Sequence, residues 1–225
     1  MDWLDGHEDS GMEKMTGLCE FRLGKTNIQI IDTISKKLKK KVIHHAKKFY
    51  FSNEQLKLNI YELEVDSLDK LSFSHPKHPK HRRFVFSGYR MCDTYELGEV
   101  ELDFYDGILY HFTIKDNCFL FDFFEKYGMP NREKLVDKHP CDLPSGDVIE
   151  FDDESERMRW YNDDIKATYL KFAQRDRKTC KITYEYSFSM WQQSVYDFVS
   201  QLDDEIRRTA NQKFEKERSG ILKKL

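Results

Sequence analysis

The sequence lacks the short motifs by which many enzymes and cofactor-binding proteins are identified. It contains no G-x-x-x-x-G-K-[ST] phosphate loop, no G-x-G-x-x-G, no zinc-binding H-E-x-x-H and no G-x-S-x-G. No stretch approaches the roughly eighteen apolar residues of a membrane-spanning helix, and the beginning of the chain lacks the basic and apolar regions of a secretory signal. We therefore expect a protein without a catalytic residue, a cofactor or a membrane span.

Cysteine is scarce as well, at five in 225 residues, and no two cysteines form a C-x-x-C pair. An odd number of scattered cysteines, without the close pairs of a zinc site, predicts buried free thiols in a reducing cytoplasm. Cys118 has apolar neighbours and no identifiable base, which favours a core residue over a reactive thiol.

Apolar and aromatic side chains are plentiful, at 39% and 14% of the chain, and could form the core of one large domain or of two small ones. Residues 1–17 are largely acidic and aperiodic, and we expect them to be disordered. Residues 18–225 are expected to form a single α+β domain, or two subdomains that meet near residues 131–156.

The clearest local pattern is a β-hairpin over residues 99–115. Apolar and polar residues alternate on both sides of Asp106-Gly107. A two-residue turn would pair Phe104 with Leu109 and set one apolar row beside polar residues. A three-residue loop would pair Phe104 with Ile108 and place both apolar rows on one face, and we prefer it.

A capped amphipathic helix is predicted to follow the hairpin. Asp116 or Asn117 can begin this helix, and Gly128 can end it after Tyr127. The helical spacing of its apolar residues predicts one buried stripe, which consists of Leu120, Phe123, Phe124 and Tyr127.

Helices are also predicted elsewhere in the chain. Thr26 and Gln29 form a potential capping box for a helix with inward-facing Ile28, Ile31, Ile34 and Leu38. Residues 52–65 fit both a capped helix and a strand, and we favour the strand. From Ser189 onward we expect a long helix. Its apolar stripe consists of Trp191, Val195, Phe198, Leu202 and Ile206, and no apolar stripe continues after Ile206.

The segment 131–156 contains prolines, a glycine and a cluster of acids, and predicts an irregular connection. A second hairpin around Asn162-Asp163 and a strand over residues 178–186 are predicted beyond it. The order of elements predicts an α+β fold, with a mainly antiparallel sheet built from hairpins, packed on amphipathic helices, and a long C-terminal helix.

Four strings in the sequence carry a resemblance: F-R-L-G-K-T, L-D-F-Y-D-G-I-L-Y-H-F-T-I, F-F-E-K-Y-G-M-P and R-W-Y-N-D-D-I. They consist of turn glycines, a helix cap and aromatic residues. In these strings the chain resembles small uncharacterised bacterial α+β proteins of the Bacteroidetes type, some of which are similar in fold to the β-lactamase-inhibitor protein. The resemblance implies a fold and no catalytic residue.

Candidate binding residues gather in the loop over residues 75–83, H-P-K-H-P-K-H-R-R. His75, His78 and His81 offer donor atoms for zinc or copper, but the two prolines favour an extended loop that holds them apart, and we expect no metal there. The candidate binding residues of the loop are Lys77, Lys80, His81, Arg82 and Arg83. The acidic clusters 152–154 and 203–205 are expected to be solvated surface.

Charge is unevenly distributed, although the total is only −3. Residues 33–90 carry fourteen Lys and Arg against five Asp and Glu, whereas residues 91–165 carry seven against twenty. The basic segments 36–48 and 77–83 could bind nucleic acid, and the acidic strands could equally pair with basic segments inside the fold. We expect a non-enzymatic binding protein of inhibitor, immunity or accessory type, whose partner is another protein and which acts through a sheet surface. Nucleic-acid association is the alternative.

Overall fold

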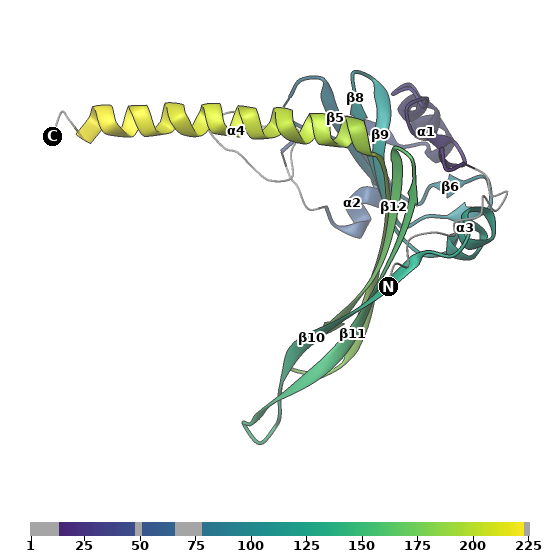
Figure 1. Ribbon diagram of the computed structural model, residues 1–225, viewed down its shortest axis with the longest axis vertical. Helices are drawn as coiled ribbons and strands as arrows, with labels where there is room; N and C mark the ends of the chain where they lie inside the picture. Colours follow the sequence, from purple (N-terminus) through teal and green to yellow (C-terminus); the bar gives the residue numbers. More distant parts are fainter. Residues whose placement is uncertain (1–13, 48–50, 66–77, 223–225) are drawn as a thin grey trace, which may run out of the picture.

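The computed structural model describes residues 14–47, 51–65 and 78–222, and its centre is a nine-stranded mixed sheet (Figure 1). The strands follow one another across the sheet in the order β10, β11, β12, β13, β9, β8, β5, β4 and β3. The β3–β4 pair is parallel, and the other neighbours are antiparallel. The chain therefore combines helices and strands and ends in a long helix, as the sequence predicts.

The elements of the large sheet come from most of the described chain. Its strands are β3 (Lys41–Ala46), β4 (Asn59–Leu63), β5 (His81–Ser87), β8 (Glu99–Tyr105), β9 (Ile108–Lys115), β10 (Asn131–Asp142), β11 (Val148–Asn162), β12 (Ile165–Arg175) and β13 (Ile182–Gln192). Two short ribbons are formed by β1 (Gly17–Leu18) with β2 (Phe21–Arg22) and by β6 (Arg90–Met91) with β7 (Tyr95–Glu96). The helices are α1 (Ile30–Leu38), α2 (Asn53–Leu58), α3 (Leu120–Tyr127) and α4 (Gln193–Leu222).

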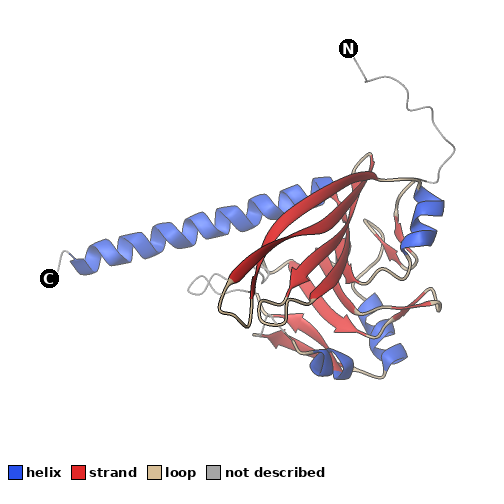
Figure 2. Ribbon diagram, turned by 90° about the horizontal axis from the view of Figure 1, so that it is seen from below, coloured by secondary structure: helices blue, strands red, loops and turns tan. Residues whose placement is uncertain are grey.

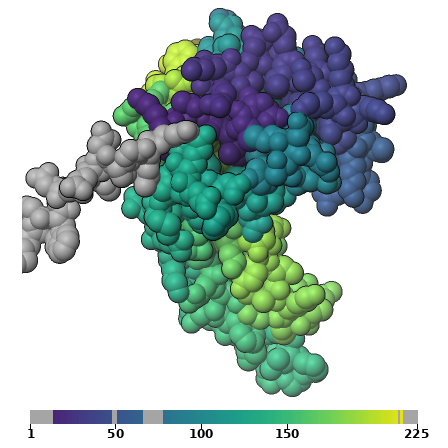
Figure 3. Space-filling view, turned by 90° about the vertical axis from the view of Figure 1, so that its right-hand side faces the viewer, coloured from purple at the N-terminus to yellow at the C-terminus, as the bar shows by residue number. Residues whose placement is uncertain are grey.

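One face of the sheet, here called the core face, is covered by α1, α3 and the two ribbons. These elements form the purple to teal surface above the green strands in Figure 3. Aromatic rings dominate the space between the layers; the ring of Phe188, for example, lies 5.1 Å from Phe119 and 4.9 Å from Phe123. The predicted core residues Phe104 and Phe112 are fully buried here. Burial of these large side chains joins the N-terminal half of the chain to the sheet.

Strands β8 and β9 form the predicted hairpin, but with the two-residue turn. Asp106 and Gly107 have φ angles of 51° and 81°, and Tyr105 lies opposite Ile108. Positive φ angles at both central positions are typical of the turns that match the twist of a hairpin. The prediction of a three-residue loop is therefore wrong.

A β-bulge nevertheless brings both apolar rows of the hairpin to one face. The register shifts between Asp103 and Phe104, so that Tyr110 has no opposite residue. Beyond the bulge Leu102 faces Phe112, and both are buried in the core. The shared apolar face is thus confirmed, and the bulge, not the loop, produces it.

Helix α3 ends as predicted, with Gly128 after Tyr127 at a φ angle of 78°. It begins later than predicted, at Leu120, after a turn in which a side-chain oxygen of Asp116 accepts hydrogen bonds from the backbone N–H groups of Asn117, at 2.6 Å, and Cys118, at 3.1 Å. The predicted stripe is confirmed, since all of its members pack in the core: Leu120, Phe123, Phe124 and Tyr127.

The two other short helices differ in part from the predictions. The capping box at Thr26 is wrong: α1 begins at Ile30, and the Thr26 hydroxyl donates to the backbone oxygen of Glu20 at 2.7 Å. In the segment 52–65 both alternatives occur in succession. Ser52 and Gln55 form a capping box that begins α2, and β4 follows directly.

Residues 131–142 and 148–156 lie in strands, and residues 143–147 form the turn between them, which corrects the prediction of an irregular connection over the whole segment. We call residues 132–155 and 172–185 the arm, because these ends of β10–β13 project from the body of the molecule (Figures 1 and 2). Most side chains of β10 are exposed, so the strand has no alternation of apolar and polar residues by which it could be identified. Ion pairs across the β10–β11 pair are present instead, such as Lys138–Glu150 at 3.7 Å.

Helix α4 crosses the other face of the sheet near β9 and β13 and then extends away from it (Figures 1 and 2). It begins at Gln193, later than predicted, because residues 189–192 still belong to β13. Val199 is buried against the sheet, whereas Phe198, a predicted member of the stripe, is 48% exposed. No helix among the described residues is long and apolar enough to span a membrane.

Four of the five cysteines form two disulfides, Cys19–Cys92 and Cys141–Cys180. The prediction of free thiols is therefore wrong for these four, and the reducing compartment on which the cytoplasmic prediction depends loses its support. Cys118 is free but exposed, which corrects its assignment to the core. The spacings of 73 and 39 residues explain why sequence inspection does not pair these cysteines.

Of the predicted disordered segment 1–17, residues 1–13 lie outside the described residues. Met15 is buried in the core, and Gly17 belongs to β1.

Candidate functional site: a polar face of the sheet

The face of the sheet opposite the core face carries two polar rows that run across the strands. Residues paired in register point to the same face, so the pairing identifies the members of each row. The first row consists of Arg83, Asp103, His111, Trp191, Lys166 and Tyr161. The second consists of Val85, Glu101, Thr113, Ser189, Thr168, Arg159 and Asn131. We call these two rows the polar face.

Among the described helices, only α2 and the first turns of α4 lie against the polar face (Figure 1). Along β13, Phe188 and Met190 on the core face are fully buried, whereas Ser189 and Trp191 on the polar face are half-buried. Tyr161, at the end of the first row, is 56% exposed. The middle of the polar face, over β9, β13, β12 and β11, is therefore accessible.

Asp103 is the centre of a buried ionic cluster at one end of the first row. Its carboxylate is fully buried and accepts hydrogen bonds from Arg83 Nε at 2.6 Å and Nη2 at 3.1 Å. His81 Nε2 lies 3.0 Å from one carboxylate oxygen, and His111 Nδ1 lies 2.7 Å from the other. Three donor side chains thus surround one acidic group.

The environment keeps Asp103 ionised. Burial alone would raise the pKa of Asp103, but Arg83 and the two histidines outweigh this effect and hold the pKa well below its usual value. An ionised carboxylate only accepts hydrogen bonds, so His81 and His111 both carry a proton on the ring nitrogen that faces it. The phenol oxygen of Tyr110 lies 3.0 Å from the same nitrogen of His81, and burial raises the pKa of this tyrosine.

Helix α4 covers the cluster and leaves a cavity of about 200 Å³ between helix and sheet. The sheet side of the cavity carries His81, Arg83 and Tyr110, and the helix side carries Tyr196, Val199, Ser200, Asp203, Asp204 and Arg207. Nδ1 of His81 is buried and makes no hydrogen bond to the described residues. This polar lining suits ordered water or a small polar molecule.

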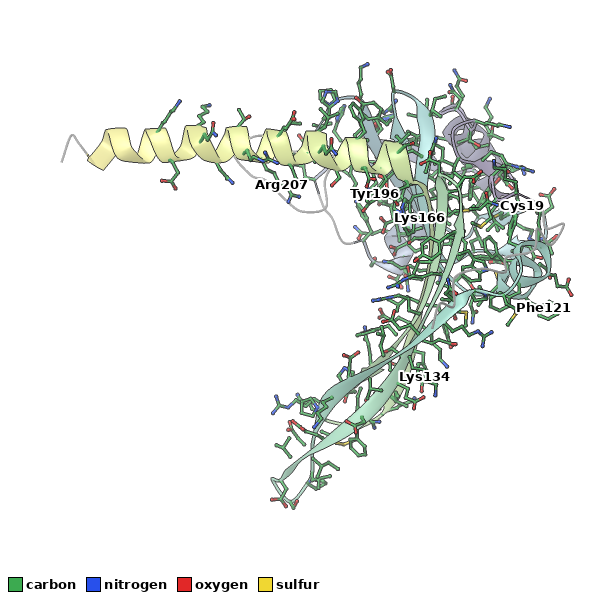
Figure 4. The ribbon with its side chains drawn as sticks, viewed as in Figure 1. Cys19, Phe121, Lys134, Lys166, Tyr196 and Arg207 are labelled. Atoms are coloured by element: carbon green, nitrogen blue, oxygen red, sulfur yellow. A yellow bond between two sulfur atoms is a disulfide. The ribbon has the colours of Figure 1, made fainter. Side chains whose placement is uncertain are left out.

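The start of α4 is fixed to the polar face by two sets of contacts. Asp164, in the β11–β12 turn, accepts hydrogen bonds from the backbone N–H of Ser194 at 2.7 Å and from its hydroxyl at 2.6 Å. Burial would raise the pKa of Asp164, but these bonds hold it below its usual value. The ring of Tyr196 lies 5.8 Å from His111 and 6.1 Å from Trp191, on the same side of the sheet as Lys166 (Figure 4).

The residues of the predicted basic loop occupy different environments. Lys77 lies outside the described residues. Lys80 pairs with Asp106 at 3.2 Å on the surface. Arg82 pairs with Glu62 at 2.5 Å. His81 and Arg83 belong to the Asp103 cluster, which lies on the opposite face of the sheet from Arg82. The structure therefore does not bring the described members of the loop together on one surface.

The prediction that the acidic clusters are solvated surface is wrong for Asp153, which is buried and pairs with Arg175.

The candidate metal residues are also separated. His75 lies outside the described residues, and His78 accepts a hydrogen bond from the backbone N–H of Lys80, whereas His81 faces Asp103. Among the described residues, one group has metal-ligand spacing, Cys19 with Glu20 and Cys92, but its sulfur atoms are joined in a disulfide.

Sequence reasoning missed Asp103, His111, Trp191 and Tyr161 as members of one surface. A signal for part of it is present, because the alternation over residues 99–115 separates a polar row from an apolar one. Trp191 and Tyr161 become neighbours of this row only through strand pairings between distant segments.

Comparison with protein-family models, with curated proteins and with solved structures finds no match for this chain. The resemblance to the β-lactamase-inhibitor type thus stays a prediction, and the candidate function depends on the geometry of the polar face.

Proposed function

We propose that this protein is a non-enzymatic binding protein, of inhibitor, immunity or accessory type, and that a partner protein binds its polar face. The observation that carries the proposal is the accessible aromatic and basic row of Tyr161, Lys166 and Trp191, with Tyr196 beside it on α4. Tyrosine, tryptophan and arginine are enriched in protein interfaces and in their energetic centres. The rigid strands hold these side chains in place, so that little conformational entropy is lost on binding.

The fold is suited to this role. We propose that the mainly antiparallel pairing allows a division of labour, in which one face forms the core and the other stays accessible to a partner. The arm and α4 both extend on the side of the polar face in Figure 1, and would flank a bound partner. The two disulfides support an oxidising compartment as the place of binding.

The proposal can be tested by site-specific photo-cross-linking in extracts of the cells that make the protein. A photoreactive amino acid replaces Tyr161 or Trp191, and the control replaces Phe121, which is 69% exposed on α3 at the opposite side of the sheet (Figure 4). We expect both polar-face positions to yield an adduct with the same protein, and the control to yield none.

Affinity measurements with the captured protein complete the test. Trp191→Ala is expected to weaken binding at least about tenfold, since central aromatic residues often contribute more than 1.4 kcal/mol, whereas Phe121→Ala leaves the affinity unchanged. Equal losses for both variants, or adducts at all three positions, would contradict the proposal.

Nucleic-acid association through the basic segments 36–48 and 77–83 is the alternative. It is favoured by the exposed side chains of Lys36, Lys39 and Lys41 at the end of α1 and the start of β3. Fluorescence anisotropy with labelled duplex and single-stranded DNA and RNA discriminates the two. We expect no complex at physiological salt; submicromolar binding that falls steeply with salt and is lost on charge reversal of these lysines would favour the alternative.

A further inference from the structure

The arm is not a simple continuation of the sheet. The β11–β12 register begins at the Asn162–Ile165 turn and ends at Glu156 opposite Lys171. Beyond this point the β10–β11 pair continues to Asp142 opposite Val148, and the β12–β13 pair continues to Arg175 opposite Ile182. The outer part of the arm thus consists of two hairpins that are no longer joined by a continuous strand register.

Few apolar contacts hold the two hairpins together. Among the described residues of the arm, the buried apolar side chains are Cys141 and Ala173, and no large one is buried. Burial of apolar surface is the main source of cohesion in proteins, so the arm has little of it. This distinguishes the arm from the body of the sheet, where aromatic residues fill the core.

Polar contacts and one covalent bond connect the hairpins instead. Arg175 donates hydrogen bonds to both carboxylate oxygens of Asp153, at 2.9 and 2.5 Å, and its guanidinium group lies 4.0 Å from the ring centre of Phe151. The disulfide Cys141–Cys180 joins the end of β10 to the loop between β12 and β13. Apart from the backbone turn between β11 and β12, this disulfide is the covalent link between the two hairpins among the described residues.

The other disulfide has a different setting. Cys19–Cys92 joins the β1–β2 ribbon to the β6–β7 ribbon, and Phe21 and Met91 next to it are fully buried in the core. These contacts would hold both ribbons in place without the covalent bond. Cys19–Cys92 therefore serves as a control for Cys141–Cys180: the segments that Cys19–Cys92 joins are also held by core contacts, whereas those that Cys141–Cys180 joins are not.

We propose that Cys141–Cys180 is a redox-sensitive clamp, whose reduction opens the arm and leaves the rest of the sheet folded. A thiolate of a dithiol reductant attacks the sulfur of Cys180, the more accessible of the two, forms a mixed disulfide and releases the thiolate of Cys141. The second thiol of the reductant then displaces Cys180 and closes the reductant's own disulfide. Two electrons and two protons pass to the protein, which gains two thiols.

This clamp deepens the proposed function, because an open arm would no longer flank a partner on the polar face. The clamp itself is testable on the isolated full-length protein, without a partner. Hydrogen exchange reports local opening, since amides in a segment that opens exchange faster than amides in the rest of the fold.

The experiment compares the oxidised protein, the same protein in dithiothreitol, the C141S/C180S variant and the matched C19S/C92S variant. We expect amides of residues 134–154 and 173–184 to exchange at least about tenfold faster in C141S/C180S and after reduction. Peptides over residues 99–115 and 186–192 are expected to keep their protection in both samples. C19S/C92S is expected to leave the arm unchanged.

Two results would overturn the clamp. The first is unchanged protection of the arm in C141S/C180S, with reduction in the wild type confirmed by the mass of the alkylated thiols. The second is an equal loss of protection across the whole sheet, which would make the bond a general support of the fold. Both outcomes are measured on the isolated protein without a partner, so they leave the binding of a partner to the polar face as a separate question.

Discussion

Replacement of Asp103 by asparagine is expected to destabilise the protein by about 3 kcal/mol. The carboxylate is fully buried, and it pairs with Arg83, whose side chain is 20% exposed. Breaking a buried ion pair by removing one partner costs about 3–5 kcal/mol, because the other charge stays buried. We take the lower limit, since the asparagine oxygen can still accept one hydrogen bond.

The measurement is equilibrium unfolding in urea, followed by tryptophan fluorescence. A matched control is Asp106→Asn in the next turn, where the partner Lys80 and the aspartate are 54% and 66% exposed. Such a surface pair contributes less than about 1 kcal/mol. The slope of the unfolding free energy against urea is expected to stay constant in both variants, so that the midpoints report stability. A cost for Asp103→Asn that is no larger than that of the control would refute the reasoning.

The same substitution has a pH signature. The pKa of Asp103 is lower in the folded than in the unfolded protein, so its contribution to stability is complete above about pH 4, the ordinary aspartate value, and is lost as the pH falls through the folded pKa. The difference in unfolding free energy between wild type and Asp103→Asn is therefore expected to shrink on acidification below about pH 4. A difference that stays constant with pH would contradict the ionised state of Asp103.

Three further substitutions test the core, the helix cap and the free thiol. Phe104→Ala is expected to lower the free energy of unfolding in urea by about 3–5 kcal/mol, because the side chain is fully buried. Phe121→Ala on the surface should change this free energy by less than about 0.5 kcal/mol. Similar losses in the two variants would contradict the hairpin register. Asp164→Ala removes the cap of α4 and is expected to cost about 1 kcal/mol, and no measurable loss would mean that the cap is dispensable. Burial and Asp116 raise the pKa of the Cys118 thiol to about 11, so its alkylation by iodoacetamide should accelerate about tenfold per pH unit between pH 7 and 10. Asp116→Asn should increase the rate at pH 8, and an unchanged rate would exclude the aspartate as a cause.

The hairpin over β8 and β9 and the stripe of α3 could be predicted because their information is local. Val100, Leu102 and Phe104 alternate with acids, and Gly128 supplies the positive φ angle that ends the helix. The bulge at Tyr110 could not be predicted in the same way. Its place depends on which residues the core and α4 bury, and Tyr110 is buried on the side of α4.

The arm shows why strands can escape sequence analysis. Its side chains are mostly exposed, so apolar residues do not alternate with polar ones, and Pro140 is compatible with a strand because β10 lies at the edge of the sheet. The ion pairs of the arm, such as Lys134 with Glu154 at 3.1 Å, join residues that are distant in the sequence. Their pattern becomes visible only when the register is known.

The uneven charge of the chain has a partial explanation in the β5–β8 pairing. Basic β5 comes from the segment with fourteen basic and five acidic residues, and acidic β8 comes from the segment with seven and twenty. Their contact brings Arg83 to Asp103, and Lys80 of the same basic segment lies 3.2 Å from Asp106 of the acidic segment. Some basic residues of the first segment are therefore paired with acidic residues of the second inside the protein, and these charges are not available to bind a polyanion.

The basic residues that this pairing does not use are the ones that separate the two functional hypotheses. Lys36, Lys39 and Lys41 are exposed at the end of α1 and the start of β3, on the sheet edge far from β11 and β12 in the strand order. Tyr161 and Lys166 lie on those two strands, and Trp191 lies on the next one. A partner protein on the polar face and a nucleic acid on the lysines would therefore contact different strands. Substitutions at one surface should leave binding at the other intact, so a single pair of variants, Trp191→Ala and Lys39→Glu, assigns any observed complex to one of the two.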